Sequence, residues 1–236
     1  ILNQRYQAWT VIKISASSIL YKGEDLVGEY PSVFIREYYP RQFCSRGDDG
    51  NSVIVENAAD YDTFKKGLDQ FIRDGNTQRG LGLGGVIAIY DVFVQNQTGY
   101  LVMERPEGIN LRKYLRTKGK MSLNQCMANM LPVMDTLEQL HQMKILHLSI
   151  NPSNILLLEG GEVKVMDVDR YTRLSTKPSA GDRKGRKARS YRAPEWENRE
   201  KELTDSADVY SVCTVMSQML KGDEALPAAI DNGLIA

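Results

Sequence analysis

Apolar and polar side chains alternate along the first third of the chain. The alternation is clear over residues 9–15 and 32–37, which is typical of strands in a half-buried sheet. Two further strands are predicted over residues 86–94 and 99–104, and the polar residues 95–98 between them predict a hairpin turn. The beginning of the chain is therefore expected to form a sheet.

Apolar positions recur at helical spacing in three later segments. They predict one helix over residues 61–73, a long helix over residues 122–141 and a last helix over residues 207–220. Ser122 is expected to cap the long helix, and Pro132 inside it predicts a kink. The second half of the chain is therefore mainly helical in character.

The order of these elements predicts two lobes of different character. Residues 45–51 are expected to form a loop, and residues 154–158 and 162–166 to form short strands. A strand-rich lobe over residues 1–104 followed by a helix-rich lobe over residues 105–236 indicates the α+β class. The joint between the lobes is where a small ligand is expected to bind.

Composition narrows the class of protein. The chain has 236 residues, 42% of them hydrophobic, and its 30 Lys and Arg residues balance 30 Asp and Glu residues. These proportions exclude a disordered chain, and a zero net charge does not favour nucleic-acid binding. Three distant cysteines form no metal or disulfide pattern, and no apolar run reaches the roughly 18 residues that span a bilayer.

Common catalytic motifs are mostly missing. The string from Gly80 to Gly85 fits the pattern GxGxxG, but it leads into a strand instead of opening a helix, so a dinucleotide site is not expected. The chain contains no Walker A, GxSxG or HExxH string, and its two histidines are His141 and His147. Hydrolase and zinc-enzyme functions are therefore disfavoured, and both histidines are expected to lie in the core.

A set of strings in a fixed order carries more information than any single motif. The strings are Val33-Phe34-Ile35-Arg36, Tyr100 to Glu104, His147 to Asn154, Asp167-Val168-Asp169, Tyr191 to Glu195 and Asp208 to Ser211. Together they resemble the protein kinase family, particularly bacterial kinases of the eukaryotic-like Ser/Thr type. The resemblance implies a bilobal α+β kinase fold with an activation segment over residues 167–195 and a helical lobe that is truncated after Gly222.

The resemblance also implies which positions correspond to the nucleotide pocket, and several carry unusual residues. Residues 15–21 stand where the family has a glycine loop but contain no glycine, Arg36 replaces the family lysine, and Asp74 replaces the helix glutamate. Phe34 replaces a small alanine and is expected to fill the adenine space. The pocket positions are Ser15, Ala16, Ser18, Leu20, Phe34, Arg36, Asp74, Met103, Glu104 and Leu156.

The catalytic loop of the resemblance keeps its scaffold and loses its base. Ser149 occupies the position of the catalytic aspartate, and a hydroxyl cannot accept a proton as a carboxylate does. Asn154 and Asp167 stand at the two metal-ligand positions, and we expect them to persist as scaffold, with capture of a divalent ion as the alternative. Framework roles are implied for His147, Glu195 and Asp208.

A basic cluster lies in the implied activation segment. Residues 170–192 contain nine Lys or Arg residues and a single acidic residue, Asp182. Such a run is usually a solvated loop, and the alternative is a docking patch for an acidic or phosphorylated protein. The partner would be a phosphopeptide-binding domain or a cognate kinase, with no nucleic acid and no membrane contact. The patch consists of Arg183, Lys184, Arg186, Lys187 and Arg189.

These observations lead to one functional expectation and one alternative. We expect a pseudokinase that is not an enzyme, binds no cofactor and acts in the cytoplasm as a regulatory or scaffolding module, within a longer protein. The alternative is an atypical ATP-dependent Ser/Thr protein kinase, or a nucleotide transferase, that uses Asp167 and Asn154 with ATP and Mg²⁺. An anion-binding module that works through the basic segment is a third hypothesis.

Overall fold

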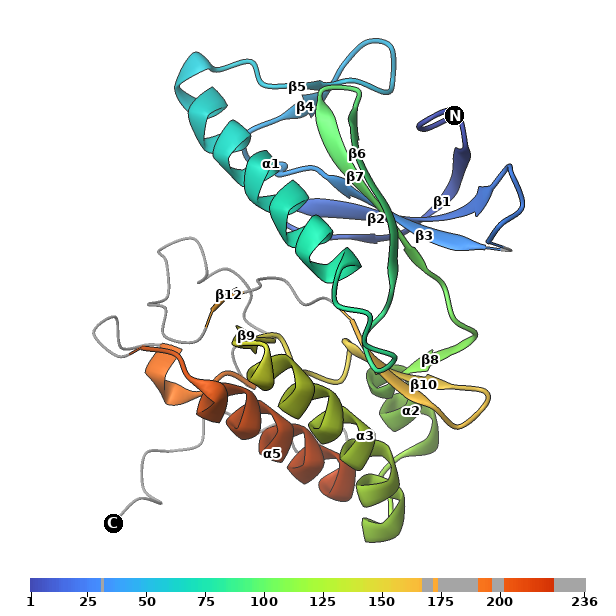
Figure 1. The fold of residues 1–236 in the computed structure, drawn as a ribbon, viewed down its shortest axis with the longest axis vertical. Coiled ribbons are helices and arrows are strands. Elements are labelled where there is room, and N and C mark those ends of the chain that lie inside the picture. Colours follow the sequence, from blue (N-terminus) through green and yellow to red (C-terminus); the bar gives the residue numbers. More distant parts are fainter. Residues whose placement is uncertain (31, 167–171, 174–190, 197–201, 223–236) are drawn as a thin grey trace. The chain divides into compact units, whose positions relative to one another are not determined.

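A computed structural model describes residues 1–30, 32–166, 172–173, 191–196 and 202–222 (Figure 1). The chain divides into two compact units. Unit 1 comprises Ile1–Gly82 and Ile87–Arg105, and unit 2 comprises Leu83–Val86 and Pro106–Ala236. The segment Leu83–Val86 belongs to unit 2 because it pairs with a strand of that unit, which the sequence pattern did not predict: the Val165 N–H donates to the Gly85 carbonyl at 2.8 Å.

Unit 1 is built on an antiparallel five-stranded sheet, as the alternating pattern predicted. Its strand order is β1-β2-β3-β7-β6. The strands are β1 (Tyr6–Ile14), β2 (Ser18–Asp25), β3 (Val33–Tyr38), β6 (Ile89–Gln95) and β7 (Thr98–Glu104). The hairpin between β6 and β7 is confirmed; both turn residues, Asn96 and Gln97, have positive φ, which suits a two-residue hairpin turn.

One face of this sheet carries an apolar core. Val33 and Ile35 on β3 are fully buried, whereas Phe34 and Arg36 between them are half-buried on the other face. The buried cluster consists of Tyr6, Val33, Ile35, Tyr100 and Val102. It explains why the alternation of β3 was readable from the sequence, because a strand with one buried face must keep period two.

The sheet curls so that the start of β1 meets β6, the opposite edge strand. The Asn3 N–H donates to Gln95 Oε1 at 2.7 Å, and the Asn3 side-chain amide donates to the Asp91 carboxylate at 3.0 Å. The Tyr6 and Phe93 rings stack with their centroids 6.2 Å apart. Unit 1 is therefore a partly closed barrel around the apolar cluster.

Helix α1 (Ala58–Arg79) confirms the helix predicted over residues 61–73 and extends it at both ends. Asn57 caps it by accepting from the Ala59 N–H at 3.0 Å. The helix continues past Gly75, where a side chain would meet Leu101 of β7 at 2.3 Å, so glycine allows the close approach of helix and sheet. Where a loop was predicted, β4 (Ser45–Arg46) pairs with β5 (Val53–Ile54).

Unit 2 contains the predicted long and last helices and several short elements. Its helices are α2 (Leu111–Lys118), α3 (Leu123–Gln142), α5 (Asp205–Lys221) and the 3-10 helix η2 (Pro194–Trp196). One sheet, ordered β11-β10-β8, has strands β8 (Gly108–Asn110), β10 (Ile155–Leu158) and β11 (Val163–Val165), and β9 (Ile145–Leu146) pairs with β12 (Thr172–Arg173). Sequence reasoning missed α2, β8 and β9.

The predicted Ser122 cap at the start of the long helix is confirmed. Ser122 and Gln125 form a capping box at the start of α3, and the helix continues through Pro132. Gly222 follows α5 with a positive φ, and its N–H donates to the Gln218 carbonyl. In the part of the chain that the structure describes, no helix is both long and apolar enough to cross a bilayer.

Candidate functional site

A buried carboxylate on α5 holds the loop that follows β9. Asp208 is fully buried and accepts from the N–H groups of His147 and Leu148 at 2.8 and 2.7 Å. It also lies 2.9 Å from His141 Nε2. Leu148 has a φ of +57°, a strained conformation for a side chain of this kind, and the two hydrogen bonds to Asp208 hold it there. Both histidines are thereby part of this buried cluster.

The next residues of the loop bring Ser149 and Asn154 together. The Asn154 side-chain amide donates to the Ser149 carbonyl at 2.9 Å and to Ser149 Oγ at 3.0 Å. Asn154 is 4% exposed, and its carbonyl accepts from the Met166 N–H at the end of β11. Among the described residues no donor reaches Asn154 Oδ1, which leaves that oxygen as an acceptor for a cation or a ligand.

The chemistry available at this loop is limited and specific. Ser149 Oγ can donate or accept a hydrogen bond, but a hydroxyl does not act as a base near neutral pH. Within the described ranges, no three His, Cys, Asp or Glu side chains are grouped so as to hold a metal ion. Asp167, the second metal-ligand position predicted from the sequence, lies outside the described residues, as does Asp169.

In unit 1 the segment at the glycine-loop position forms a short turn between β1 and β2. Ser15 closes this turn: its Oγ accepts from the Ser18 N–H at 2.9 Å and donates to the Ser18 carbonyl at 3.0 Å. Ala16 is exposed, and Leu20 on β2 is buried. The turn is thus held by serine hydroxyl contacts, and none of its positions requires glycine.

The other pocket positions in unit 1 lie on β3, α1 and β7. Phe34 and Arg36 share a face of β3, and the Arg105 guanidinium lies 5.9 Å from the centre of the Phe34 ring. Asp74 on α1 accepts from Gln70 Nε2 at 2.6 Å. Whether Phe34 fills the adenine space and whether Arg36 pairs with Asp74 remain predictions.

Three further predicted positions have plain structural surroundings. Met103 is buried in β7, and the Glu104 N–H donates to the Ala88 carbonyl at 2.9 Å. Leu156 is half-buried in β10 of unit 2, opposite Lys164 of β11.

The remaining predicted residues lie next to or within segments that the structure does not describe. Glu195 lies half-buried in η2 and makes no ion pair with a described residue. The docking patch of residues 183–189 and the part of the chain after Gly222 lie outside the described residues.

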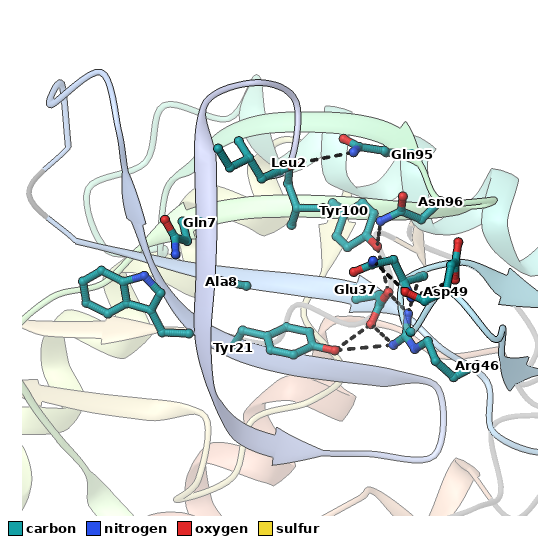
Figure 2. A pocket seen from close by; sticks show the side chains of 14 residues that line it. Leu2, Gln7, Ala8, Tyr21, Glu37, Arg46, Asp49, Gln95, Asn96 and Tyr100 are labelled. Atoms are coloured by element: carbon teal, nitrogen blue, oxygen red, sulfur yellow. Dashed lines mark hydrogen bonds and ion pairs between the residues drawn. The ribbon is translucent and has the colours of Figure 1, made fainter.

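Sequence reasoning missed a cavity at the mouth of the curled sheet in unit 1 (Figure 2). Its floor is Glu37, whose carboxylate receives hydrogen bonds from Arg46, Tyr21 and Tyr100. These residues come from four different strands, and no local motif links them. The signal that could have pointed to the site is an acidic residue at position 37 of a strand that is otherwise apolar on that face.

Comparison with known proteins identifies the class. The protein kinase domain family matches residues 44–235. The chain is 27% identical to the serine/threonine-protein kinase PrkC of Bacillus subtilis over 163 residues, which are 69% of this chain and 25% of that protein. It is 30% identical to a probable serine/threonine-protein kinase, pknA2, of Bifidobacterium longum over 168 residues, 70% of this chain and 21% of that protein.

The chain is also similar to a further serine/threonine-protein kinase and to a solved structure. The serine/threonine-protein kinase PknL of Mycobacterium tuberculosis is 30% identical over 157 residues, covering 66% of this chain and 39% of that protein. The solved structure "PpkA-294 apo form" has a TM-score of 0.73 and 19% identity, covering 91% of this chain and 75% of that one. The chain spans between about a fifth and two fifths of the length of these curated relatives.

This chain belongs to the protein kinase family, and it has the kinase-like α+β fold predicted from its sequence. Its homologues are bacterial Ser/Thr protein kinases of the eukaryotic-like type. The prediction that the domain is not an enzyme is wrong, because the protein kinase domain family matches the chain and its relatives are named serine/threonine-protein kinases. The departures from the family pattern at Ser149, Arg36 and residues 15–21 do not by themselves show a loss of activity.

Proposed function

We propose that the chain is an ATP-dependent Ser/Thr protein kinase domain that works slowly because position 149 carries a hydroxyl instead of a carboxylate. The observation that carries the proposal is the ordered catalytic loop. Asp208 holds its backbone at His147 and Leu148, and Asn154 is fixed against Ser149 with its Oδ1 left as an acceptor. The Ser/Thr substrate class is supported by the names of the relatives.

The chemistry tolerates a missing base better than many reactions do. The bond between the γ-phosphorus and the bridging oxygen of ATP breaks, a bond to the substrate hydroxyl oxygen forms, and ADP leaves. Because the transition state is loose, the hydroxyl proton departs late, to the transferred phosphoryl group or to water. Ser149 Oγ positions the hydroxyl by a hydrogen bond. Without a base the rate should fall only about 10²-fold, the low end of the usual effect.

A magnesium ion is implied by ATP, and Asn154 fits one. Mg²⁺ prefers oxygen ligands, and Asn154 Oδ1 is an oxygen that no donor among the described residues occupies. Asn154 and, by resemblance, Asp167 would hold the ion. When bound, the ion neutralises charge on the phosphates.

The residues of unit 1 predict weak nucleotide binding. The serine-closed turn at residues 15–18 lacks the glycines that allow a backbone to approach phosphates. Arg36 would contact phosphate through its planar guanidinium instead of the compact ammonium of lysine. We therefore expect a high KM for ATP together with a low kcat.

The protein partner is proposed to be acidic or phosphorylated. Five basic residues lie close together in the sequence, and guanidinium groups bind phosphate in a bidentate manner. A cognate kinase or a phosphopeptide-binding domain has the required chemistry. Binding should weaken steeply with added salt, and replacement of all five residues with Gln should remove both the binding and its salt dependence.

The test is a phosphoryl-transfer assay with radiolabelled ATP and a Ser/Thr peptide library. We expect slow transfer by the wild type and at least about tenfold faster transfer by Ser149→Asp, because the new carboxylate can still accept from the Asn154 amide. Asn154→Ala should abolish transfer. The control Ser206→Asp adds the same charge at an exposed position of α5 and should leave the rate unchanged.

Two results would count against the proposal. One is the absence of transfer in both the wild type and Ser149→Asp while both proteins remain folded. The other is an equal rate in Asn154→Ala and the wild type, which would assign the transfer to a contaminating kinase.

A further inference from the structure

A cavity of about 560 Å³ opens at the mouth of the curled sheet, wholly within unit 1 (Figure 2). The bend at Ile1 and Leu2, the start of β1, the loop over residues 49–51 and the β6–β7 turn surround it. Its volume lies within the roughly 300–1,000 Å³ of typical small-molecule sites. Sites of this kind often occupy the mouths of barrels, and none of these residues takes part in the proposed phosphoryl transfer.

The floor of the cavity is a closed hydrogen-bond network. Glu37 is 1% exposed, and Arg46 donates to both of its oxygens, at 2.8 and 2.6 Å. The Tyr21 and Tyr100 hydroxyls each donate to the same carboxylate at 2.8 Å. Figure 2 shows these three side chains converging on Glu37. Burial and the nearby Glu37 carboxylate raise the pKa of both tyrosines, so they stay neutral hydroxyls.

The charges of the lining cancel or are already engaged. Arg46 and Glu37 form a bidentate ion pair, and Arg46 also donates to the Asn51 carbonyl at 2.7 Å. The Asp49 carboxylate accepts from the N–H groups of Asn51 and Ser52 and from the Ser52 hydroxyl, so it is used by its own turn. Glu37 and Arg46 neutralise each other and the exposed Asp49 is an anion, so the described lining offers no unpaired cationic side chain to a phosphate or a carboxylate.

The polar groups that remain available include two neutral side-chain amides, those of Asn51 and Asn96. The Asn96 amide donates once, to the Tyr100 hydroxyl at 3.1 Å, and the Asn51 amide donates once, to the Asp49 carbonyl at 2.9 Å. Each amide keeps one N–H and its oxygen for other partners among the described residues. The cavity therefore offers donors and acceptors side by side, next to the rings of Tyr21 and Tyr100.

We propose that this cavity binds a neutral polyhydroxylated compound of mono- or disaccharide size. A hydroxyl group both donates and accepts, which matches the donor and acceptor that each amide keeps, and the carbon face of a sugar ring matches an aromatic wall. An apolar ligand would bury the amides without replacing their water. The network around Glu37 is formed before binding, so little ordering cost opposes it.

The experiment is calorimetric titration of the 236-residue chain with D-glucose, maltose and sorbitol. Glucose and maltose should bind saturably with dissociation constants near about 1 mM. Sorbitol carries hydroxyls but no ring face and should bind about tenfold more weakly. Inorganic phosphate and triglycine should produce no saturable heat.

Two pairs of variants locate the binding. Tyr21→Phe removes one hydroxyl and keeps the ring, and Asn51→Ala removes one amide and keeps the backbone carbonyl that Arg46 uses; each should weaken sugar binding about tenfold. The matched controls Tyr61→Phe and Asn76→Ala change exposed residues of α1 outside the cavity and should leave it unchanged.

The proposal is overturned by any of three results. The first is that neither sugar saturates the protein. The second is that both cavity variants bind sugar like the wild type. The third is that phosphate or triglycine binds more tightly than the sugars. Circular dichroism of each variant confirms that the comparison is made between folded proteins, and the two cavity variants are independent should one of them fail to fold.

Discussion

A buried carboxylate holds a local hydrogen-bond network in each unit, Glu37 in unit 1 and Asp208 in unit 2, and the two networks differ. Asp208 in unit 2 accepts from two backbone N–H groups and contacts His141, so it fixes the main chain of one loop. Among the described residues, Glu37 in unit 1 accepts from side chains alone, those of Tyr21, Arg46 and Tyr100. We call these two carboxylates anchors: Asp208 holds the backbone of a loop, and Glu37 holds side chains that line a cavity.

The kind of hydrogen-bond donor determines how much stability is lost when each buried carboxylate is removed. Backbone N–H groups cannot turn away when their acceptor is removed, whereas tyrosine and arginine side chains can rotate toward water. The Arg46 side chain is 27% exposed and can regain solvent. Loss of Asp208 should therefore cost more stability than loss of Glu37.

The largest effect is expected from Asp208→Ala. It leaves the His147 and Leu148 N–H groups buried without an acceptor, and it removes the restraint on the left-handed Leu148, so unfolding free energy should fall by about 3–5 kcal/mol. Urea unfolding followed by circular dichroism measures the loss. Asp205→Ala, at an exposed position in the first turn of the same helix, should cost less than about 1 kcal/mol.

A second readout ties this loss to the loop. The His147 and Leu148 amides should exchange their hydrogens much faster in Asp208→Ala than in the wild type or in Asp205→Ala. Equal exchange in all three proteins would show that Asp208 does not hold the loop, and the comparison with Glu37 would lose its basis.

A smaller effect is expected from Glu37→Gln. The amide keeps the shape of the side chain, but its single oxygen can accept from only one of the two tyrosines, and the ion pair with Arg46 is lost. Stability should therefore fall by about 2 kcal/mol. Chemical denaturation measures it, with the exposed Glu56→Gln as the control. A loss as large as that of Asp208→Ala would contradict the view that side-chain partners can rehydrate.

The loop over residues 147–154 could be recognised in the sequence because its residues are consecutive. His147 to Asn154 form one string, and their partner Asp208 belongs to a later string in the same fixed order. The pattern was therefore visible without a structure. The sheet was predictable for a similar reason, because β3 alternates with period two over a single buried face.

The cavity could not be predicted, because its residues meet only in three dimensions. Glu37, Arg46 and Tyr100 lie on β3, β4 and β7, and the pairing of β4 with β5 depends on two residues in each strand. Helix α2 was missed because it has only eight residues, with two buried apolar positions, Leu111 and Leu115, among four basic side chains. The helix extension past Gly75 depends on contact with Leu101, which no local propensity reports.

A pH titration tests Asp25, another buried carboxylate of unit 1, which lies at the other end of the barrel. Hydrogen bonds from Arg5 hold the pKa of Asp25 well below its usual range. A depressed pKa in the folded state gives stability that is present above the unfolded value of about 3.9 and is lost as the pH falls below it. The melting temperature should fall between about pH 4 and pH 2, and less steeply in Asp25→Asn.

The control for this titration is Asp62→Asn, at an exposed position of α1. It should follow the wild-type curve. A curve for Asp25→Asn that has the same slope as the wild type would mean that other carboxylates carry the acid sensitivity of unit 1.

The smallest effect concerns Cys44, two residues before Arg46. Burial raises the pKa of its thiol to about 11, and the thiol donates to the Pro40 carbonyl. It should react with iodoacetamide near neutral pH at least about tenfold more slowly than the exposed Cys213. Mass spectrometry of the two alkylated peptides measures both rates in one sample.

This thiol also reports on how local the Glu37 anchor is. If Glu37 holds Arg46 and thereby the start of the β4–β5 hairpin, Glu37→Gln should speed the alkylation of Cys44 and leave Cys213 unchanged. Asp208→Ala should leave Cys44 unchanged, because its anchor serves another loop. Acceleration of Cys44 by both variants would mean that the two carboxylates report on general loosening of the chain and do not act as separate anchors.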